Sequence, residues 1–253
     1  MTFLAMWLLA AGLGDLLRPG AELDPHRRWW WPAALGVPVL LVVWLLAGID
    51  GGLRLVALPL MAALLVGWAH TSTAAVAAGA GEESSAHPAD PHRPAALAVL
   101  LVTVVVGFAV AGLDPAVAGP LARWWRGLGL ASLATVPPTR ALMVLAVVVA
   151  QVGTGNVVVR LVLDAAGAHR EPGVLRGGRW LGPMERLFLV VLALAGQPTA
   201  AAVVVAAKGL LRFPELQDQR GAGQRIDTVT EYFLLGTFTS WLVALGSVLL
   251  TLR

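Results

Sequence analysis

Long apolar runs separated by short polar stretches cover most of this chain, and their lengths predict helices. A helix needs about 20 apolar residues to cross a bilayer. Runs of that kind predict membrane helices at residues 31–49, 53–68, 94–113, 140–166, 186–207 and 229–252. A shorter run at 1–17 lacks a basic leader and a clear cleavage site, so we expect a retained first helix. The pattern therefore predicts an all-α, polytopic integral membrane protein with about six or seven membrane segments.

The polar stretches divide the chain into two membrane regions. Residues 1–69 form an N-terminal region of three helices, with a tight turn at Asp50-Gly51-Gly52. Residues 70–93 are rich in Ala, Ser and Pro, which predicts a polar flexible linker. Residues 94–253 form the C-terminal region. Within it, prolines bound a stretch at 114–139 with paired Trp and Arg, typical of a segment that lies on the membrane surface.

Polar residues also interrupt the apolar runs at membrane depth. One run holds Gln151, Asn156 and Arg160 around a Gly-Thr-Gly stretch, and another holds Gln197 beside a proline. Broken segments of this kind are typical of transporters that bind solutes between discontinuous helices. Tight helix packing through small residues is an equally weighted alternative for the first run. Asp15 is a further intramembrane charge, and we expect both Asp15 and Arg160 to be buried within the bundle and to pair with each other.

Basic residues flank the run 186–207 on both sides. They are Arg170, Arg176, Arg179 and Arg186 before it, and Lys208, Arg212, Arg220 and Arg225 after it. A spanning helix would place these loops on opposite faces, which the positive-inside rule disfavours. A re-entrant hairpin that turns at Gly196-Gln197-Pro198 would put both in the cytoplasm and bring Glu185 level with Lys208. We favour the hairpin over a proline-kinked spanning helix.

Charged and aromatic residues at the borders of the last two runs form the candidate site. Two cations four residues apart, Lys208 and Arg212, fit a phosphate or carboxylate clamp, with snorkelling at a helix end as the alternative. For Glu185, just after Pro183, and for Glu231, at capping-box spacing from Thr228, helix capping is the alternative. The predicted binding or charge cluster on the cytoplasmic side is Glu185, Arg186, Lys208, Arg212, Glu231 and Tyr232.

Composition narrows the function classes. Hydrophobic residues make up 58% and charged residues 13% of the chain, whereas soluble domains average roughly 45–50% and 25%. The net charge is +3, and the cations are almost all arginines at the ends of apolar runs, where they meet anionic lipid headgroups rather than nucleic acid. The chain has no cysteine and none of the common catalytic, nucleotide or metal motifs, so we expect no metal and no cofactor.

Three segments of the C-terminal region resemble a widespread bacterial family of polytopic membrane proteins whose function is unknown. They are GRWLGPMERL from Gly178, AAKGLLRF from Ala206 and EYFLLGTFTS from Glu231, and LLAAGLGDLL from Leu8 is similar to the family's opening helix. The family usually continues that helix with an Asp-Phe-hydrophobic-Gln stretch, which Leu16, Leu17 and Arg18 replace here. The resemblance implies a multi-pass protein of the bacterial cytoplasmic (inner) membrane. It also implies that the Glu-Arg, Lys-x-x-x-Arg and Glu-Tyr elements belong to one site, but it implies no activity.

These patterns favour a non-enzymatic membrane module. We expect either a transport or channel element or a scaffold subunit, in contact with anionic lipid and with a second copy or another membrane protein as partner. The alternative is a membrane-embedded enzyme acting on a lipid or a lipid-linked phosphate. There Lys208 and Arg212 would hold the anion, and Glu185 or Glu231 would serve as the base. A cavity reaching residues 151–156 would favour transport, and a lipid-open groove beside Lys208 would favour the enzyme.

Overall fold

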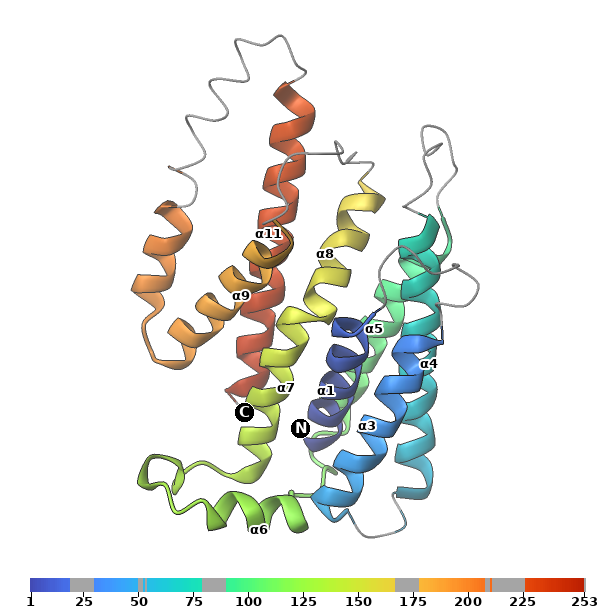
Figure 1. Ribbon diagram of the computed structural model, residues 1–253, viewed down its shortest axis with the longest axis vertical. Helices are drawn as coiled ribbons and strands as arrows, with labels where there is room; N and C mark the ends of the chain where they lie inside the picture. The colour runs from blue at the N-terminus through green and yellow to red at the C-terminus, as the bar shows by residue number, and fades with distance from the viewer. Residues whose placement is uncertain are drawn as a thin grey trace.

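The protein folds into a bundle of helices around a buried first helix (Figure 1). A computed structural model describes residues 1–18, 30–49, 52, 54–78, 90–166, 178–207, 210 and 226–252; for 54–55, 178–180 and 226–233 it describes the backbone alone. The long helices are α1 (Thr2–Leu16), α3 (Trp31–Ala47), α4 (Arg54–Ala78), α5 (His92–Ala109), α7 (Pro138–Val152), α8 (Thr154–Ala165), α9 (Gly178–Leu194) and α11 (Ile226–Thr251). Shorter elements are α6 (Pro120–Gly127), a 3-10 turn (Ala131–Leu133) and the helix Pro198–Ala207. No strand occurs in the described ranges, so the all-α prediction is confirmed.

Three helices are long and apolar enough to cross a membrane. They are Val56–Ala78, His92–Ala109 and Leu234–Thr251, and the bent pair α7 and α8 adds a fourth if it counts as one broken span. The apolar helices α1, α3 and Pro198–Ala207 are shorter, at 10–17 residues. The structure thus supports a membrane protein with three or four candidate spans, and the predicted six or seven segments are not confirmed.

Helix α1 is the core of the bundle. Nearly all of its residues are buried, from Thr2 to Gly12 together with Gly14 and Asp15. A helix that is apolar on every face is buried either in lipid or among other helices, and α1 lies among other helices. It packs most closely against α7 and α3 and also contacts α4, α5 and α8. The first helix of the predicted N-terminal region thus packs against helices of the predicted C-terminal region.

The crossing of α1 and α7 depends on two glycines. A Cβ atom on Gly153 would overlap the carbonyl oxygen of Gly12, and one on Gly12 would lie 3.0 Å from the backbone nitrogen of Ala150. Gly153 leaves the helical conformation, with ψ at −84°, and α7 and α8 meet there at an angle of 43°. This is the interruption expected in the run 140–166. Helix α1 therefore lies against the point at which the neighbouring helix is broken.

Helix α4 extends further than the sequence pattern indicates. The third helix was expected to end at residue 68, with a flexible linker from residue 70, but α4 continues to Ala78. Residues 70–78 of the predicted linker are therefore helical, while 79–89 lie outside the described residues. The alanine-rich sequence explains the extension, since alanine has the highest helix propensity. The extension also buries Ser72 and Thr73 against the end of α1.

The chain reverses direction between α9 and the helix Pro198–Ala207 (Figure 1). Gly196 has a positive φ of 70°, a conformation that costs a residue with a Cβ atom roughly 1–2 kcal/mol. The N–H groups of Gly196 and Gln197 donate to the carbonyls of Ala193 and Leu192, so the turn satisfies the last carbonyls of α9. Pro198 then opens the next helix, where its missing N–H is tolerated. A helical hairpin thus forms at the predicted Gly-Gln-Pro turn.

We expect this hairpin to enter and leave the membrane on one side. In that case single cysteines introduced as Gly173→Cys and Gln219→Cys, in the two flanking basic loops, label from the same face of inverted and right-side-out vesicles. The reason is that a re-entrant turn returns the chain to its starting side, and a spanning helix does not. A cysteine at Gly129, in the exposed loop after α6, serves as the marker of the opposite end of the bundle. Labelling of positions 173 and 219 from different faces would establish a spanning segment.

Candidate functional site at the broken helix

Buried polar groups surround the break at Gly153 and form two connected sets, which we call the polar centre. One set joins Asp15 and Arg18 of the α1 end to Trp68, Ser72, Thr73 and Thr154. The other joins Arg186 of α9 to Gln151, Asn156, Ser240 and Ser247. The first set reaches the break through the Thr154 side chain, and the second set has acceptors on both sides of Gly153, at Gln151 and Asn156. The break is therefore the point at which charges from α1 and α9 contact α7 and α8.

Asp15 is the anion of the first set, and its carboxylate is fully buried. One oxygen pairs with Arg18, whose Nη2 atom lies 2.6 Å away. The other oxygen accepts hydrogen bonds from Trp68 Nε1 at 3.0 Å and from Thr154 Oγ1 at 2.7 Å. A charge can be held in a low-dielectric interior only when it is paired and hydrogen-bonded, and this carboxylate has both kinds of partner.

The partner cation is fixed in turn by α4. The terminal nitrogens of Arg18 donate to Thr73 Oγ1 at 3.0 Å and to Ser72 Oγ at 2.6 Å. The guanidinium is 15% exposed, so this pair lies at the border of the core rather than at its middle. The guanidinium of Arg18, which has five N–H donors, thus neutralises Asp15 and links the end of α1 to α4.

Arg186 is the cation of the second set and is only 1% exposed. Its Nε and Nη2 atoms donate to the carbonyl oxygen of Gln151 at 3.2 and 2.8 Å. The same Nη2 donates to Asn156 Oδ1 at 2.6 Å, and Nη1 donates to Ser240 Oγ at 3.1 Å. Arg186 therefore holds together α7, α8 and α11 through acceptors on either side of the break.

These bonds replace backbone pairing that the break removes. The last carbonyls of a helix have no partner within it. Here the Gln151 carbonyl accepts from Arg186, and the Val152 carbonyl accepts from the side-chain amide of Asn156 at 3.1 Å. Gly155 leaves the space that the guanidinium occupies, because a Cβ atom there would lie 3.0 Å from Arg186 Nε. In this Gly-Thr-Gly-Asn sequence, Gly153 breaks the helix and Thr154 supplies the hydroxyl that binds Asp15. Gly155 then leaves space for the guanidinium of Arg186, and Asn156 supplies the amide that binds the Val152 carbonyl.

The two charges match the polarity of the two helix ends. Thr154, which donates to Asp15, is the first residue of α8, where the helix dipole favours an anion. Gln151, which accepts from Arg186, lies in the last turn of α7, where the dipole favours a cation. A broken helix with this arrangement can bind an anionic group on one side and a cationic group on the other. In this conformation the protein's own side chains take both positions.

Gln151 also reaches α11. Its Nε2 donates to Ser247 Oγ at 2.6 Å, while its buried Oε1 has no hydrogen-bond partner among the described residues. Gln151 and Asn156 were both predicted as intramembrane polar residues, and the structure brings them together at Arg186. Gln197 was predicted in the same group, but it lies exposed at the turn after α9.

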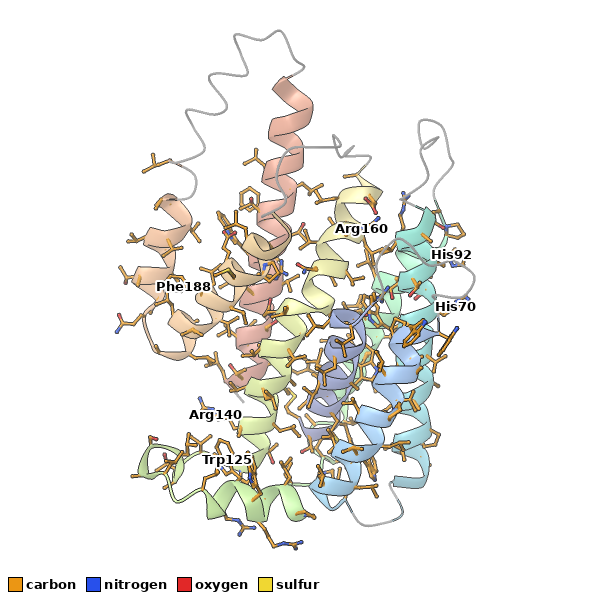
Figure 2. All side chains as sticks on the ribbon, in the orientation of Figure 1. His70, His92, Trp125, Arg140, Arg160 and Phe188 are labelled. Carbon is orange, nitrogen blue, oxygen red and sulfur yellow. The ribbon has the colours of Figure 1, made fainter. Side chains whose placement is uncertain are left out.

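The expected pairing of Asp15 with Arg160 is wrong. Asp15 pairs with Arg18, whereas Arg160 pairs with Asp164 at 3.6 Å and donates to the carbonyl of Val76 at 3.2 Å. The Arg160 side chain is 38% exposed and lies towards the upper end of α8 in Figure 2. Its position on α8 separates it from the break by more than one helical turn, which explains why a nearer cation neutralises Asp15.

The predicted cytoplasmic charge cluster is described only in part. Lys208 and Arg212 lie outside the described residues, and the side chains of Glu231 and Tyr232 are not described. Glu185 accepts a hydrogen bond from Trp241 Nε1 at 3.1 Å, which ties α9 to α11. Its neighbour Arg186 points into the core instead. Convergence of the other four residues stays a prediction.

The helix-capping alternatives for Glu185 and Glu231 are wrong, because both helices begin earlier than expected. Helix α9 begins at Gly178 and contains Pro183, so Glu185 is not in its first turn. Helix α11 begins at Ile226, so Thr228 lies inside the helix rather than at its N-cap. A cap therefore does not explain either Glu185 or Glu231.

Two hollows in the described part of the chain lie away from the polar centre. One, of about 170 Å³, is almost wholly apolar and lies between α1, α4 and α5, with Trp7, Met61 and Gly107 in its wall. The other, of about 480 Å³, lies between α6 and the loop that follows it. Neither is lined by residues 151–156 or by the helix Pro198–Ala207. At the polar centre itself, the buried side chains of Asp15 and Arg186 hydrogen-bond to residues on α7 and α8.

Comparison of the chain with protein-family models, with curated proteins and with solved structures finds no match. The resemblance carried by the segments from Gly178, Ala206 and Glu231 therefore stays a prediction.

Proposed function

We propose that this chain is a multi-pass protein of the bacterial cytoplasmic membrane that works as a transport or channel element, with the polar centre as its solute site. The observation that carries the proposal is the broken helix α7 and α8, whose two ends each hold a buried charge of the protein. Transporters with discontinuous helices bind anionic groups at half-helix N-termini and cations at the unwound carbonyls and C-terminal ends. The same two positions are present at Thr154 and Gln151.

In this proposal the described conformation is the closed one. Asp15 and Arg186 occupy the helix ends, so a polar solute enters by taking over hydrogen bonds that these side chains now make. The exchange is favoured because neither charge has to move into lipid, where it would be costly. Gln151 Oε1, which has no partner among the described residues, supplies an additional acceptor for the solute.

Flux through reconstituted vesicles tests the proposal. Purified protein in proteoliposomes is assayed with tracer sodium, potassium, chloride and phosphate, and with pyranine as a probe of protons. We expect at least one of these to cross faster than in protein-free vesicles. Asp15→Asn and Arg186→Lys, which keep side-chain size or charge, should lower that flux about tenfold or more, equivalent to about 1.4 kcal/mol of lost interaction. Arg140→Gln, an exposed arginine on the same broken helix, should leave it unchanged.

The scaffold alternative makes the opposite prediction. A scaffold subunit would use the polar centre only to hold its helices together, so no probe would cross faster than in protein-free vesicles although circular dichroism showed a folded protein. Equal flux in wild type and in both polar-centre variants would show that Asp15 and Arg186 do not form the solute site.

A further inference from the structure

Helix α6 lies across the lower end of the bundle, crosswise to the long helices (Figure 1). Its start is fixed to α3, because the N–H groups of Ala118 and Gly119 both donate to the carbonyl of Ala47, at 3.0 and 2.8 Å. Pro120 then opens the helix. Both α3 and α7 contact α6 from the same side, so α6 has the position of a helix at the membrane surface (Figure 1).

Hydrogen bonds fix the shape of the loop that forms one wall of the hollow beside α6. Trp125 Nε1 donates to the carbonyl of Val136 at 3.0 Å, which closes the loop back onto the helix. Inside the loop, the N–H of Leu133 donates to the carbonyl of Leu130 at 2.9 Å, and the N–H of Val136 donates to the carbonyl of Leu133 at 3.0 Å. The resulting hollow of about 480 Å³ is lined by both apolar and polar groups, and Leu130, Leu133 and Arg126 are among its lining residues. Its volume is in the range of small-molecule sites, roughly 300–1,000 Å³.

Helix α6 and the loop at 128–137 carry positive charges and no negative ones. Arg123 and Arg126 are neighbours on α6, at i and i+3. Arg126 uses only its Nε within the protein, donating to the Ala122 carbonyl at 3.1 Å, and its terminal nitrogens have no acceptor among the described residues. The sequence from 115 to 163 contains no Asp or Glu, and the Asp114 carboxylate is only 3% exposed and already paired. Two guanidinium groups are thus available to an anion.

The surroundings identify the anion as part of a lipid. Trp124 is 61% exposed and Leu130 is 53% exposed, so an apolar surface adjoins the cations. A soluble anion gains nothing from such a surface, whereas a phospholipid presents its phosphate and its acyl chains together. Exposed tryptophan is typical of the membrane interface, and the arginine fork binds phosphate oxygens in pairs.

We propose that α6 and the loop at 128–137 form a binding site for one anionic phospholipid. The phosphate pairs with Arg123 and Arg126, and the glycerol and upper acyl chains occupy the hollow beside Leu130 and Leu133. The site is separate from the polar centre, so the proposal is independent of solute transport. It also accounts for the position of α6, because a bound lipid fixes the depth of this end of the bundle in the membrane.

Native mass spectrometry of the detergent-solubilised protein tests the site. The protein is mixed with equal amounts of palmitoyl-oleoyl phosphatidylglycerol and phosphatidylcholine, and the bound lipids are counted. We expect one phosphatidylglycerol to be retained in preference to phosphatidylcholine. Arg123→Gln and Arg126→Gln should each lower that preference about fivefold, and the double variant about 30-fold, since one cation near an anionic headgroup contributes about that factor. Arg126→Lys, which keeps the positive charge, should keep most of the preference for phosphatidylglycerol that Arg126→Gln loses.

Matched controls separate this site from a general effect of charge. Arg140 lies near the same end, in the first turn of α7 and above Trp125 in Figure 2, and Arg140→Gln should keep the preference. An equal loss in Arg140→Gln, or an unchanged preference in the double variant, would overturn the proposal. Competition with glycerol phosphate, which has no acyl chains, decides the ligand class. If it displaces the lipid at comparable concentration, the site takes a soluble anion and the lipid assignment is wrong.

Discussion

Replacing Arg186 by methionine should lower the free energy of unfolding by about 3–5 kcal/mol, because three acceptors lose their donor inside the bundle. The Gln151 carbonyl, Asn156 Oδ1 and Ser240 Oγ all accept from this one guanidinium. A buried polar group left without a partner costs about 1–3 kcal/mol. Methionine fills similar space but donates nothing. Unfolding in detergent, followed by circular dichroism during a denaturant titration, measures the change.

Two companion variants make this result specific. Arg140→Met removes an exposed arginine from α7 and should change stability by no more than about 0.5 kcal/mol. Arg186→Lys keeps the charge but lacks the planar fork, so it should recover only part of the loss. A midpoint for Arg186→Met as close to wild type as that of the Arg140 variant would mean that these hydrogen bonds do not stabilise the fold.

A second large effect is expected from Gly153→Ala. The new methyl group would overlap the carbonyl oxygen of Gly12, and both sides of the contact are backbone, which cannot turn away as a flexible side chain can. Helices α1 and α7 must then separate, and the variant should lose about 3 kcal/mol or more. It should also lose flux in the vesicle assay, because Asp15 and Thr154 lie on either side of this contact.

Gly246→Ala is the matched comparison for this substitution. Gly246 lies in α11, and no atom lies within 4 Å of a Cβ built there. Alanine in a helix is favoured over glycine by roughly 0.5–1 kcal/mol, so this variant should be as stable as wild type or slightly more stable. If Gly153→Ala unfolds at the same denaturant concentration as Gly246→Ala, the close approach of α1 to the break is not a feature of the folded protein.

The sequence pattern predicts the helices and the breaks well, and the reason is local. Apolar runs of sufficient length give α5 and α11, and the Gly-containing polar stretches give the break at Gly153 and the turn at Gly196. Each of these features depends on residues close together in the chain. The ten-residue extension of α4 was missed because alanine, serine and threonine are common in linkers as well as in helices.

Burial and pairing were harder to predict, because they depend on which helices are neighbours. A lipid-facing helix is as apolar as a protein-buried one, so hydropathy alone does not identify α1 as the core. Arg186 was placed at a membrane border because it opens an apolar run, yet α9 begins at Gly178 and carries it inward. One signal was present: Arg18 follows Asp15 at i+3, a spacing at which side chains on a helix meet. No comparable spacing in the sequence indicates that Gly155 lies against Arg186.

The burial of α1 sets a condition on how the chain is made. Thr154, a direct partner of Asp15, follows it by 139 residues, so a ribosome completes α1 long before α7 and α8 exist. During that interval the carboxylate must be neutralised by something already synthesised. Arg18, three residues away, is the one partner of Asp15 that meets this condition at once; Trp68 arrives next, and Thr154 last. The partners of Asp15 therefore become available in the order of synthesis, with the local ion-pair partner first and the helix-end hydroxyl of Thr154 last.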